Sequence, residues 1–201
     1  LHLSIRRQRQ MCIRDSYEQM KVRLLNGTHS LIAYLGALSG VGTIPEAIGL
    51  DGIESAARAV LRDEYEPSIE VPSGVDIRAY ESELFERWAN SALGHRTSQV
   101  GTDGSVKLRQ RIPEPAMLAI RNGGMPHLIA LTVAGYLSCL APLPGFDPGP
   151  HAAAMTDGAR ERLAGYAASA RDGRELAQRV IGELHLFGDE LGSQDAFITL
   201  S

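Results

Sequence analysis

Three side chains suited to proton transfer and oxygen binding occur close together near the start of the chain. They are Lys21, Asn26 and His29, within the stretch YEQMKVRLLNGTHSLIAYLGAL (residues 17–38). If this stretch is one α-helix with about 100° per residue, the three share an arc of about 140°. Apolar residues occupy the same arc, so we expect this face to be buried.

A buried lysine loses its proton more readily than an exposed one, because burial disfavours the charged form. Lys21 could therefore act as a general acid and base near neutral pH, while Asn26 and His29 hold a substrate oxygen by hydrogen bonds. In the structural alternative, Lys21 extends to solvent, Asn26 bonds to nearby backbone and His29 is a core histidine. The residue types alone leave both interpretations open.

The composition is that of a globular protein, with 44% hydrophobic and 22% charged residues among 201. A formal charge of −4 and scattered basic residues argue against a nucleic-acid partner. No apolar run is long enough to span a membrane. Cys12 and Cys139 form neither a disulfide framework nor a metal-ligand spacing, so the reducing cytoplasm is the expected compartment.

The two ends of the chain differ from its middle. Residues 1–16, LHLSIRRQRQMCIRDS, have no helical or strand period and resemble translated sequencing-adapter DNA at the edge of a metagenomic reading frame. The alternative is a flexible basic arm. We therefore expect the domain to comprise residues 17–201, and the apolar ending suggests truncation at the C-terminus.

Apolar residues recur with helical spacing and nowhere alternate as in a strand. We expect helices at 17–38, from Pro45 to about 62 with a break near residue 50, at 76–93, from 117 to about 121, and at 126–139, 157–170 and 173–186. Gly40 and Gly42 follow a helix rather than a strand, so we reject a phosphate-binding loop there. The expected fold class is all-α, one packed multi-helix domain.

A second polar block lies at residues 95–111, HRTSQVGTDGSVKLRQR, with a turn predicted at Asp103-Gly104. The first stretch resembles the signature that opens the C-terminal domain of the polyol-specific long-chain dehydrogenases, the mannitol dehydrogenase family, whose Lys-x4-Asn-x2-His spacing matches Lys21, Asn26 and His29. The second block resembles the fructuronate-reductase (D-mannonate oxidoreductase) branch of that family. The resemblance extends from residue 17 to about 187 and is weaker after residue 113.

This resemblance implies a helical domain of the 6-phosphogluconate dehydrogenase C-terminal-like type. It also implies an NAD-dependent oxidoreductase that interconverts a secondary alcohol and a ketone, D-mannonate and D-fructuronate in this branch. By the same resemblance, Lys21 is the general acid and base, and Asn26 and His29 bind and polarise the reacting oxygen. It implies a small sugar acid or polyol as substrate and no metal.

A hexuronate carries a carboxylate, which needs a cationic partner. Arg96 and Lys107 are the candidates, because arginine can bind a carboxylate through two hydrogen bonds and lysine supplies a point charge. The alternative for each is a solvated loop residue. Arg109 and Arg111 are expected to be surface charges.

The chain departs from the family pattern in two ways. Ser91 and Arg109 stand where the resemblance would place prolines. Family members also place a Rossmann-type domain before the lysine helix, and no glycine fingerprint occurs in these 201 residues. The resemblance therefore implies a fragment that carries half an active site and is inactive alone.

Two groups of alternatives remain. Within the same chemistry, the close runner-up to a fructuronate reductase is a mannitol 2-dehydrogenase or a tagaturonate reductase. From another class, it could be a helical binding module without catalysis, although such a module has no need of a buried lysine. The sequence leaves the oligomeric state open.

Overall fold

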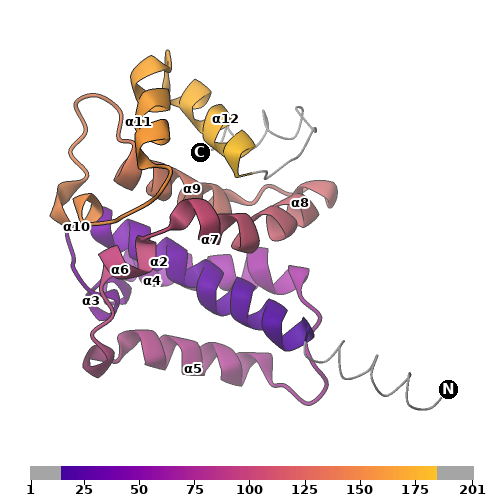
Figure 1. The fold of residues 1–201 in the computed structure, drawn as a ribbon. Helices are drawn as coiled ribbons and strands as arrows, with labels where there is room; N and C mark the ends of the chain where they lie inside the picture. Colours follow the sequence, from indigo (N-terminus) through magenta and orange to yellow (C-terminus); the bar gives the residue numbers. More distant parts are fainter. Residues whose placement is uncertain (1–14, 185–201) are drawn as a thin grey trace.

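A computed structural model describes residues 15–184 of the chain, and these residues are helical almost throughout (Figure 1). The expectations for residues 1–14 and for the C-terminal end beyond 184 lie outside the described residues. In the described part, the one β-type pairing is an isolated bridge between Thr43 and Arg96. The expected all-α fold is confirmed.

The helices include α-helices, labelled α, and short 3-10 or π-helical segments, labelled η. Residues 15–20 are α-helical and lead into η1 (Lys21–Gly27), which is followed by α2 (Thr28–Leu38), α3 (Ile44–Ile48), α4 (Asp51–Ala59), η2 (Val60–Tyr65), η3 (Glu66–Ser68), α5 (Ile77–Ala89), η4 (Ser91–Leu93), α6 (Thr97–Gly101), α7 (Gly104–Arg111), α8 (Pro113–Arg121), α9 (His127–Leu140), α10 (Gly149–Ala153), α11 (Arg160–Ser169) and α12 (Gly173–Glu183).

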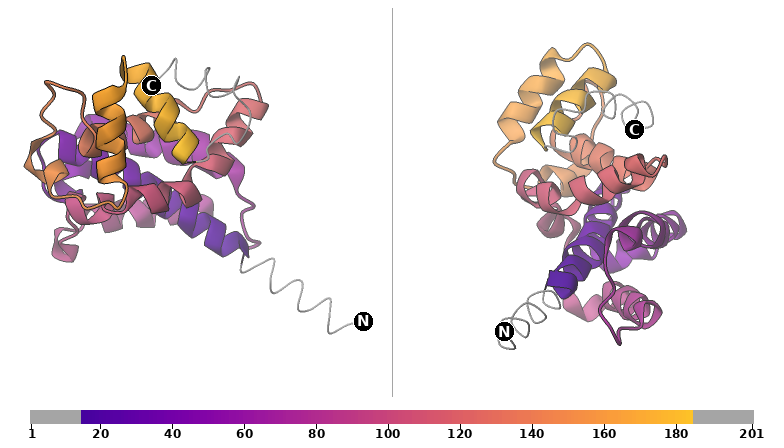
Figure 2. Two further views of the ribbon diagram at one scale, coloured as in Figure 1. Left: turned by 45° about the horizontal axis from the view of Figure 1, so that its top comes forward. Right: turned by 90° about the vertical axis from the view of Figure 1, so that its right-hand side faces the viewer.

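The helices are arranged around α2, which runs through the middle of the molecule (Figures 1 and 2). Helices α9, α6 and α3 pack directly against α2. Helix α5 lies along one side of the molecule, and α11 with α12 lies at the opposite side (Figure 2). None of the helices within residues 15–184 is long and apolar enough to cross a membrane.

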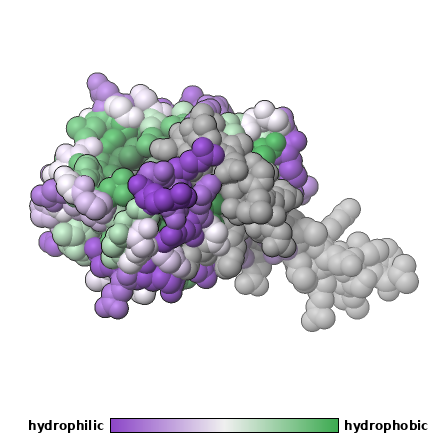
Figure 3. Space-filling view, turned by 90° about the horizontal axis from the view of Figure 1, so that it is seen from above, coloured by the Kyte–Doolittle hydropathy of each residue, from purple (hydrophilic) through white to green (hydrophobic). Residues whose placement is uncertain are grey.

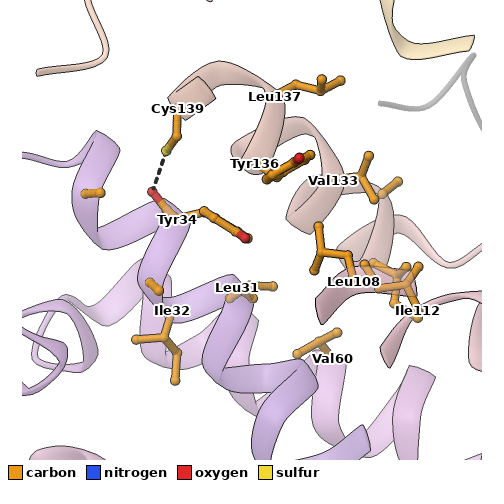
Figure 4. Close-up of a cluster of buried hydrophobic side chains, with 14 of the residues drawn as sticks. Leu31, Ile32, Tyr34, Val60, Leu108, Ile112, Val133, Tyr136, Leu137 and Cys139 are labelled. Atoms are coloured by element: carbon orange, nitrogen blue, oxygen red, sulfur yellow. Dashed lines mark hydrogen bonds between the residues drawn. The ribbon is translucent and has the colours of Figure 1, made fainter. Parts of the chain in front are cut away.

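The core forms where α2 meets α9, because both helices are apolar on nearly every face. Tyr34 and Tyr136 pack edge to face with their ring centroids 5.6 Å apart (Figure 4). The Tyr34 hydroxyl donates a hydrogen bond to the Gly101 carbonyl, which fixes α6 onto the same core. Burial raises the pKa of the Cys139 thiol to about 12, so this cysteine packs as a small apolar residue.

The helix that carries Lys21, Asn26 and His29 is continuous, as expected, but it is not α-helical throughout. Seven residues, Lys21–Gly27, form a π-helix. In a π-helix each amide bonds to the carbonyl five residues earlier, and one turn takes about 4.4 residues. The angle between Lys21 and Asn26 around the helix axis therefore narrows from about 140° to roughly 50°.

The π-helical segment fits against a second one, η2, through a glycine. Tyr65, the last residue of η2, is fully buried against Gly27, the last residue of η1. A Cβ atom at Gly27 would lie only 2.6 Å from Cζ of the Tyr65 ring. Helices that approach this closely leave no room for a side chain, so this position requires glycine.

Two groups of ion pairs fix the helices around the site. The guanidinium of Arg23, which is buried in η1, pairs with Glu114 of α8 and donates to the Ser68 carbonyl. The buried carboxylate of Glu81 in α5 pairs with three arginines, Arg58, Arg62 and Arg78. Two of these pairs anchor α5 to α4 and η2, and Trp88 of α5 lies beside His29 of α2.

Replacing Gly27 by alanine is predicted to destabilise the protein. The added methyl group would overlap the buried Tyr65 ring, so we expect a loss of about 1–3 kcal/mol in the free energy of unfolding, measured by urea denaturation. Gly165→Ala is the matched control, because a Cβ there meets open space in the middle of α11 and should stabilise slightly. Equal effects of the two substitutions would contradict this packing.

Candidate functional site

Lys21 lies at the open end of the site. Its side chain is exposed, and no residue within 15–184 forms a hydrogen bond or ion pair with its ammonium group. The expectation that Lys21 is buried is therefore wrong for this chain. The reason is that the first turns of the helix extend beyond the elements that cover α2 (Figure 1).

Asn26 is half-buried one π-helical repeat after Lys21. Its backbone carbonyl accepts hydrogen bonds from the Ser30 hydroxyl, at 3.1 Å, and from Nη1 of Arg111, at 3.2 Å. Its side-chain amide has no partner among the described residues. The amide is therefore available to bind a ligand oxygen.

His29 lies largely buried between the rings of Trp88 and His95, with ring centroids 6.0 Å and 6.1 Å away. Desolvation, together with the nearby positive charges of His95, Arg111, Lys107 and Arg87, lowers the pKa of His29 to about 3. The imidazole is therefore neutral at physiological pH. A neutral imidazole donates from one ring nitrogen and accepts at the other.

Unpartnered polar atoms gather around this part of the helix. Four buried side-chain atoms in the described chain have no hydrogen-bond partner, and they are Thr28 Oγ1, His29 Nε2, Tyr65 Oη and Trp88 Nε1. Two of these residues are adjacent in α2, and the other two pack on Gly27 and His29. Because buried polar atoms are normally satisfied, this concentration indicates where a ligand or another part of the protein would supply partners.

Helix α7 brings the second polar block to the same place. Nζ of Lys107 donates to the carbonyls of Val100 and Thr102, which leaves one of its three protons free. Arg109 is exposed, as expected. Arg111 is not the surface charge that we expected, because its guanidinium is half-buried and donates to Asn26 and to Ser30 Oγ, at 2.7 Å.

Arg96 faces a different region. Side chains alternate along an extended segment, so the bridge at Thr43 and Arg96 directs His95 towards His29 and Arg96 away from it. Arg96 lines a separate open hollow of about 470 Å³ together with Glu46 and His151. The structure thus brings Lys107, but not Arg96, close to His29, and the role predicted for Arg96 stays a prediction.

Another hollow is mainly apolar. It lies between α9 and α12, has a volume of about 340 Å³ and is lined by residues such as Val133, Leu137 and Ile181. Apolar and charged surfaces lie side by side on the face seen from above (Figure 3). The lining of this hollow holds one hydroxyl and one guanidinium, from Ser138 and Arg174, and no acid–base pair. Residues 15–184 also contain no group of three or more potential metal ligands.

Sequence reasoning missed three contributors to the site, Trp88, His95 and Arg111. A signal for Arg111 was present, because Lys107 and Arg111 are four residues apart and must share a face of one helix. Nothing in the local sequence shows that this face turns towards Asn26. That information lies in the packing of α7 on η1.

Taken together, one helix face presents an ammonium group, a free amide and a neutral imidazole beside two further cations. These groups can donate hydrogen bonds to one oxygen atom and exchange a proton with it. They suit a substrate whose oxygen changes between carbonyl and hydroxyl. They also suit a substrate that carries negative charge.

Comparison with known families gives one match over nearly the whole chain. The profile described as "Mannitol dehydrogenase C-terminal domain" matches residues 14–200. It includes the helix that carries Lys21, Asn26 and His29 and the block that contains Lys107 and Arg111. The resemblance noted from the sequence is therefore confirmed at the level of the family.

Relatives from several organisms are similar over part of their length. D-mannonate oxidoreductase of Escherichia coli (strain K12) is 44% identical over 121 residues, which are 60% of this chain and 25% of that protein. Mannitol 2-dehydrogenase of Aspergillus niger is 27% identical over 184 residues, 92% of this chain and 36% of that protein. The chain thus spans about a quarter to little more than a third of these relatives.

A solved structure agrees with the fold. The ternary complex of Pseudomonas fluorescens mannitol 2-dehydrogenase with NAD and D-mannitol matches with a TM-score of 0.78 and 25% identity. The match covers 92% of this chain and 36% of that one.

The buried, neutral state of His29 gives a prediction about pH. Its pKa is about 3 in the folded chain and about 6.5 when unfolded, so the unfolded state binds more protons between these values. The contribution of His29 to stability is fully present above pH 6.5 and is lost progressively as the pH falls towards 3. NMR should show no titration of the His29 ring between pH 5 and 8.

A midpoint near 6.5 for His29 would contradict the burial and the cationic surroundings described above.

Proposed function

Because this chain belongs to the mannitol dehydrogenase C-terminal domain family, we propose that it is the substrate-binding part of an NAD-dependent dehydrogenase. The reaction interconverts a secondary alcohol and a ketone in an acyclic sugar acid, D-mannonate and D-fructuronate. The E. coli relative named D-mannonate oxidoreductase supports the sugar acid. The cations beside His29 support it as well, since they suit an anionic substrate.

The π-helical segment Lys21–Gly27 is the observation that carries this proposal. Such segments are rare and occur frequently at functional sites. This one begins at the lysine that would move the proton and ends one residue after Asn26. Its wider turn brings these two residues to within roughly 50° of each other around the axis, whereas an α-helix would separate them by about 140°.

In the proposed reaction Lys21 moves the proton. Its Nζ gives a proton to the ketone oxygen during reduction and takes the proton back from the hydroxyl during oxidation. The Asn26 amide donates a hydrogen bond to that oxygen and stabilises the negative charge that develops on it. His29, which is neutral, can donate from Nε2 to the same oxygen without repelling the ammonium of Lys21.

NAD, when bound, would accept or supply the hydride at the reacting carbon. The described residues do not fit a dinucleotide site, because they contain no strand and hence no strand–turn–helix unit. The cofactor would therefore be held mainly by protein outside this chain. The part contributed by this chain is to bind, orient and exchange a proton with the substrate.

Related reactions remain as alternatives. A mannitol 2-dehydrogenase or a tagaturonate reductase would use the same three residues, Lys21, Asn26 and His29. The reactions would differ in which chemical group of the substrate lies next to Lys107, at the end away from the reacting oxygen. A non-catalytic helical module is less well supported. Such a module would gain stability by satisfying the buried Nε2 of His29, which has no partner here. The cytoplasm remains the expected compartment.

The test is to assay the full-length product of the gene that encodes this chain. We expect it to reduce D-fructuronate with NADH in preference to D-tagaturonate and D-fructose. Lys21→Ala should lower kcat by about 10²–10⁴-fold, because general acid–base catalysis contributes about that much. Lys21→Arg should lose comparable activity, since arginine keeps the charge but does not release its proton.

Arg121→Ala is the control, because Arg121 is exposed at the end of α8. It should retain the activity of the parent. A parent that reduces none of these ketones, or a Lys21→Ala variant as active as the parent, would show that the proposed function is wrong.

A further inference from the structure

Helix α7 presents two cations on the face that packs towards η1. Lys107 and Arg111 are four residues apart, and like charges at that spacing destabilise a helix. Neither forms an ion pair with a carboxylate in the part of the chain that the structure describes. Asp103 and Asp157 act electrostatically on Lys107, whereas the groups that act so on Arg111 are Tyr34, Tyr65 and the like-charged Lys107. Arg111 is thus a half-buried cation without a carboxylate partner among the described residues.

Hydrogen bonds from one edge of its guanidinium hold Arg111 in place. Nη1 donates to the Asn26 carbonyl and to Ser30 Oγ, and Ser30 itself donates to the same carbonyl. A guanidinium has five N–H groups, so the groups on Nη2 and Nε remain. Neither nitrogen is one of the fully buried atoms that lack a hydrogen-bond partner. This second edge is therefore open to a ligand.

The open edge lies in surroundings that favour an anion. Lys107 adds positive charge on the same helix, and Arg87 and His95 add positive charge near His29. His29 itself is neutral, so it adds no charge that would compete with Arg111 for an anion. The carbonyl that anchors Arg111 belongs to Asn26, so a group bound to Arg111 lies beside the residue proposed to hold the reacting oxygen.

We propose that the open edge of Arg111 binds the carboxylate of the sugar acid, while Lys107 contributes charge at a distance. This inference rests on the proposed function and names its carboxylate subsite. An arginine edge matches the two oxygens of a carboxylate, and a neutral polyol offers no such group. Arg111 would then select acids over polyols and, through the Asn26 carbonyl, align the acid with the site of reaction.

The first test measures kinetics on the full-length gene product with D-mannonate and NAD. Arg111→Gln should raise KM for D-mannonate about 10- to 100-fold and change kcat much less, because a charge-assisted contact made equally in the ground and transition states is lost. Arg111→Lys should recover part of the loss, since it keeps the charge without the planar pair of donors.

Arg109→Gln is the matched control, because it removes the same charge from an exposed position on the same helix. Its KM for D-mannonate should equal that of the parent. If Arg111 only supports the Asn26 backbone, Arg111→Gln should lower kcat and leave KM unchanged. That result would overturn the proposal while the proposed function stands.

A second test needs no catalysis and separates the two hypotheses. The 201-residue chain is titrated with D-mannonate and, separately, with neutral D-mannitol, while the Arg111 Nε–H signal is followed by NMR. We expect D-mannonate to shift this signal and D-mannitol to leave it in place at the same concentration. Arg111→Gln should weaken D-mannonate binding at least tenfold. Equal responses to both compounds, or no response to either, would overturn the carboxylate subsite even if the full-length product is active.

Discussion

The close contact between Gly27 and the Tyr65 ring is the constraint on which the rest of the site depends. It joins the last residues of two π-helical segments, and it allows η1 and η2 to approach without an intervening side chain. Arg23 fixes another side of η1 through Glu114 and Ser68. With η1 held from both sides, its unusual register is maintained, and that register sets the relative positions of Lys21 and Asn26.

The charges around the site follow from the same packing. The chain is acidic overall, with a formal charge of −4, yet basic groups collect where α7 and α5 meet the lysine helix. Their nearness to His29, added to its burial, keeps that imidazole neutral. A site with free hydrogen-bond donors and excess positive charge differs from an ordinary helical core, in which polar atoms find partners within the fold.

The sequence predicted the fold well because helices leave local signals. Periodic apolar residues located most of the helices, and the Asp103-Gly104 turn appears as a left-handed residue, with φ of 57° at Asp103. The π-helical register was missed, since the sequence pattern of residues 21–27 does not distinguish it from an α-helix. Lys21 was expected to be buried and Arg111 exposed, whereas Lys21 is exposed and Arg111 is half-buried, because tertiary packing determines the exposure of both.

The measurement that tests the central claim most directly is the hydrogen-bond register of residues 21–27. Scalar couplings across hydrogen bonds, recorded by NMR on the 201-residue chain, identify which carbonyl each amide bonds to. A π-helix predicts coupling between the Asn26 amide and the Lys21 carbonyl. Coupling to the carbonyl of Val22 instead would mean an ordinary α-helix, with Lys21 and Asn26 about 140° apart around the axis, and would contradict the account.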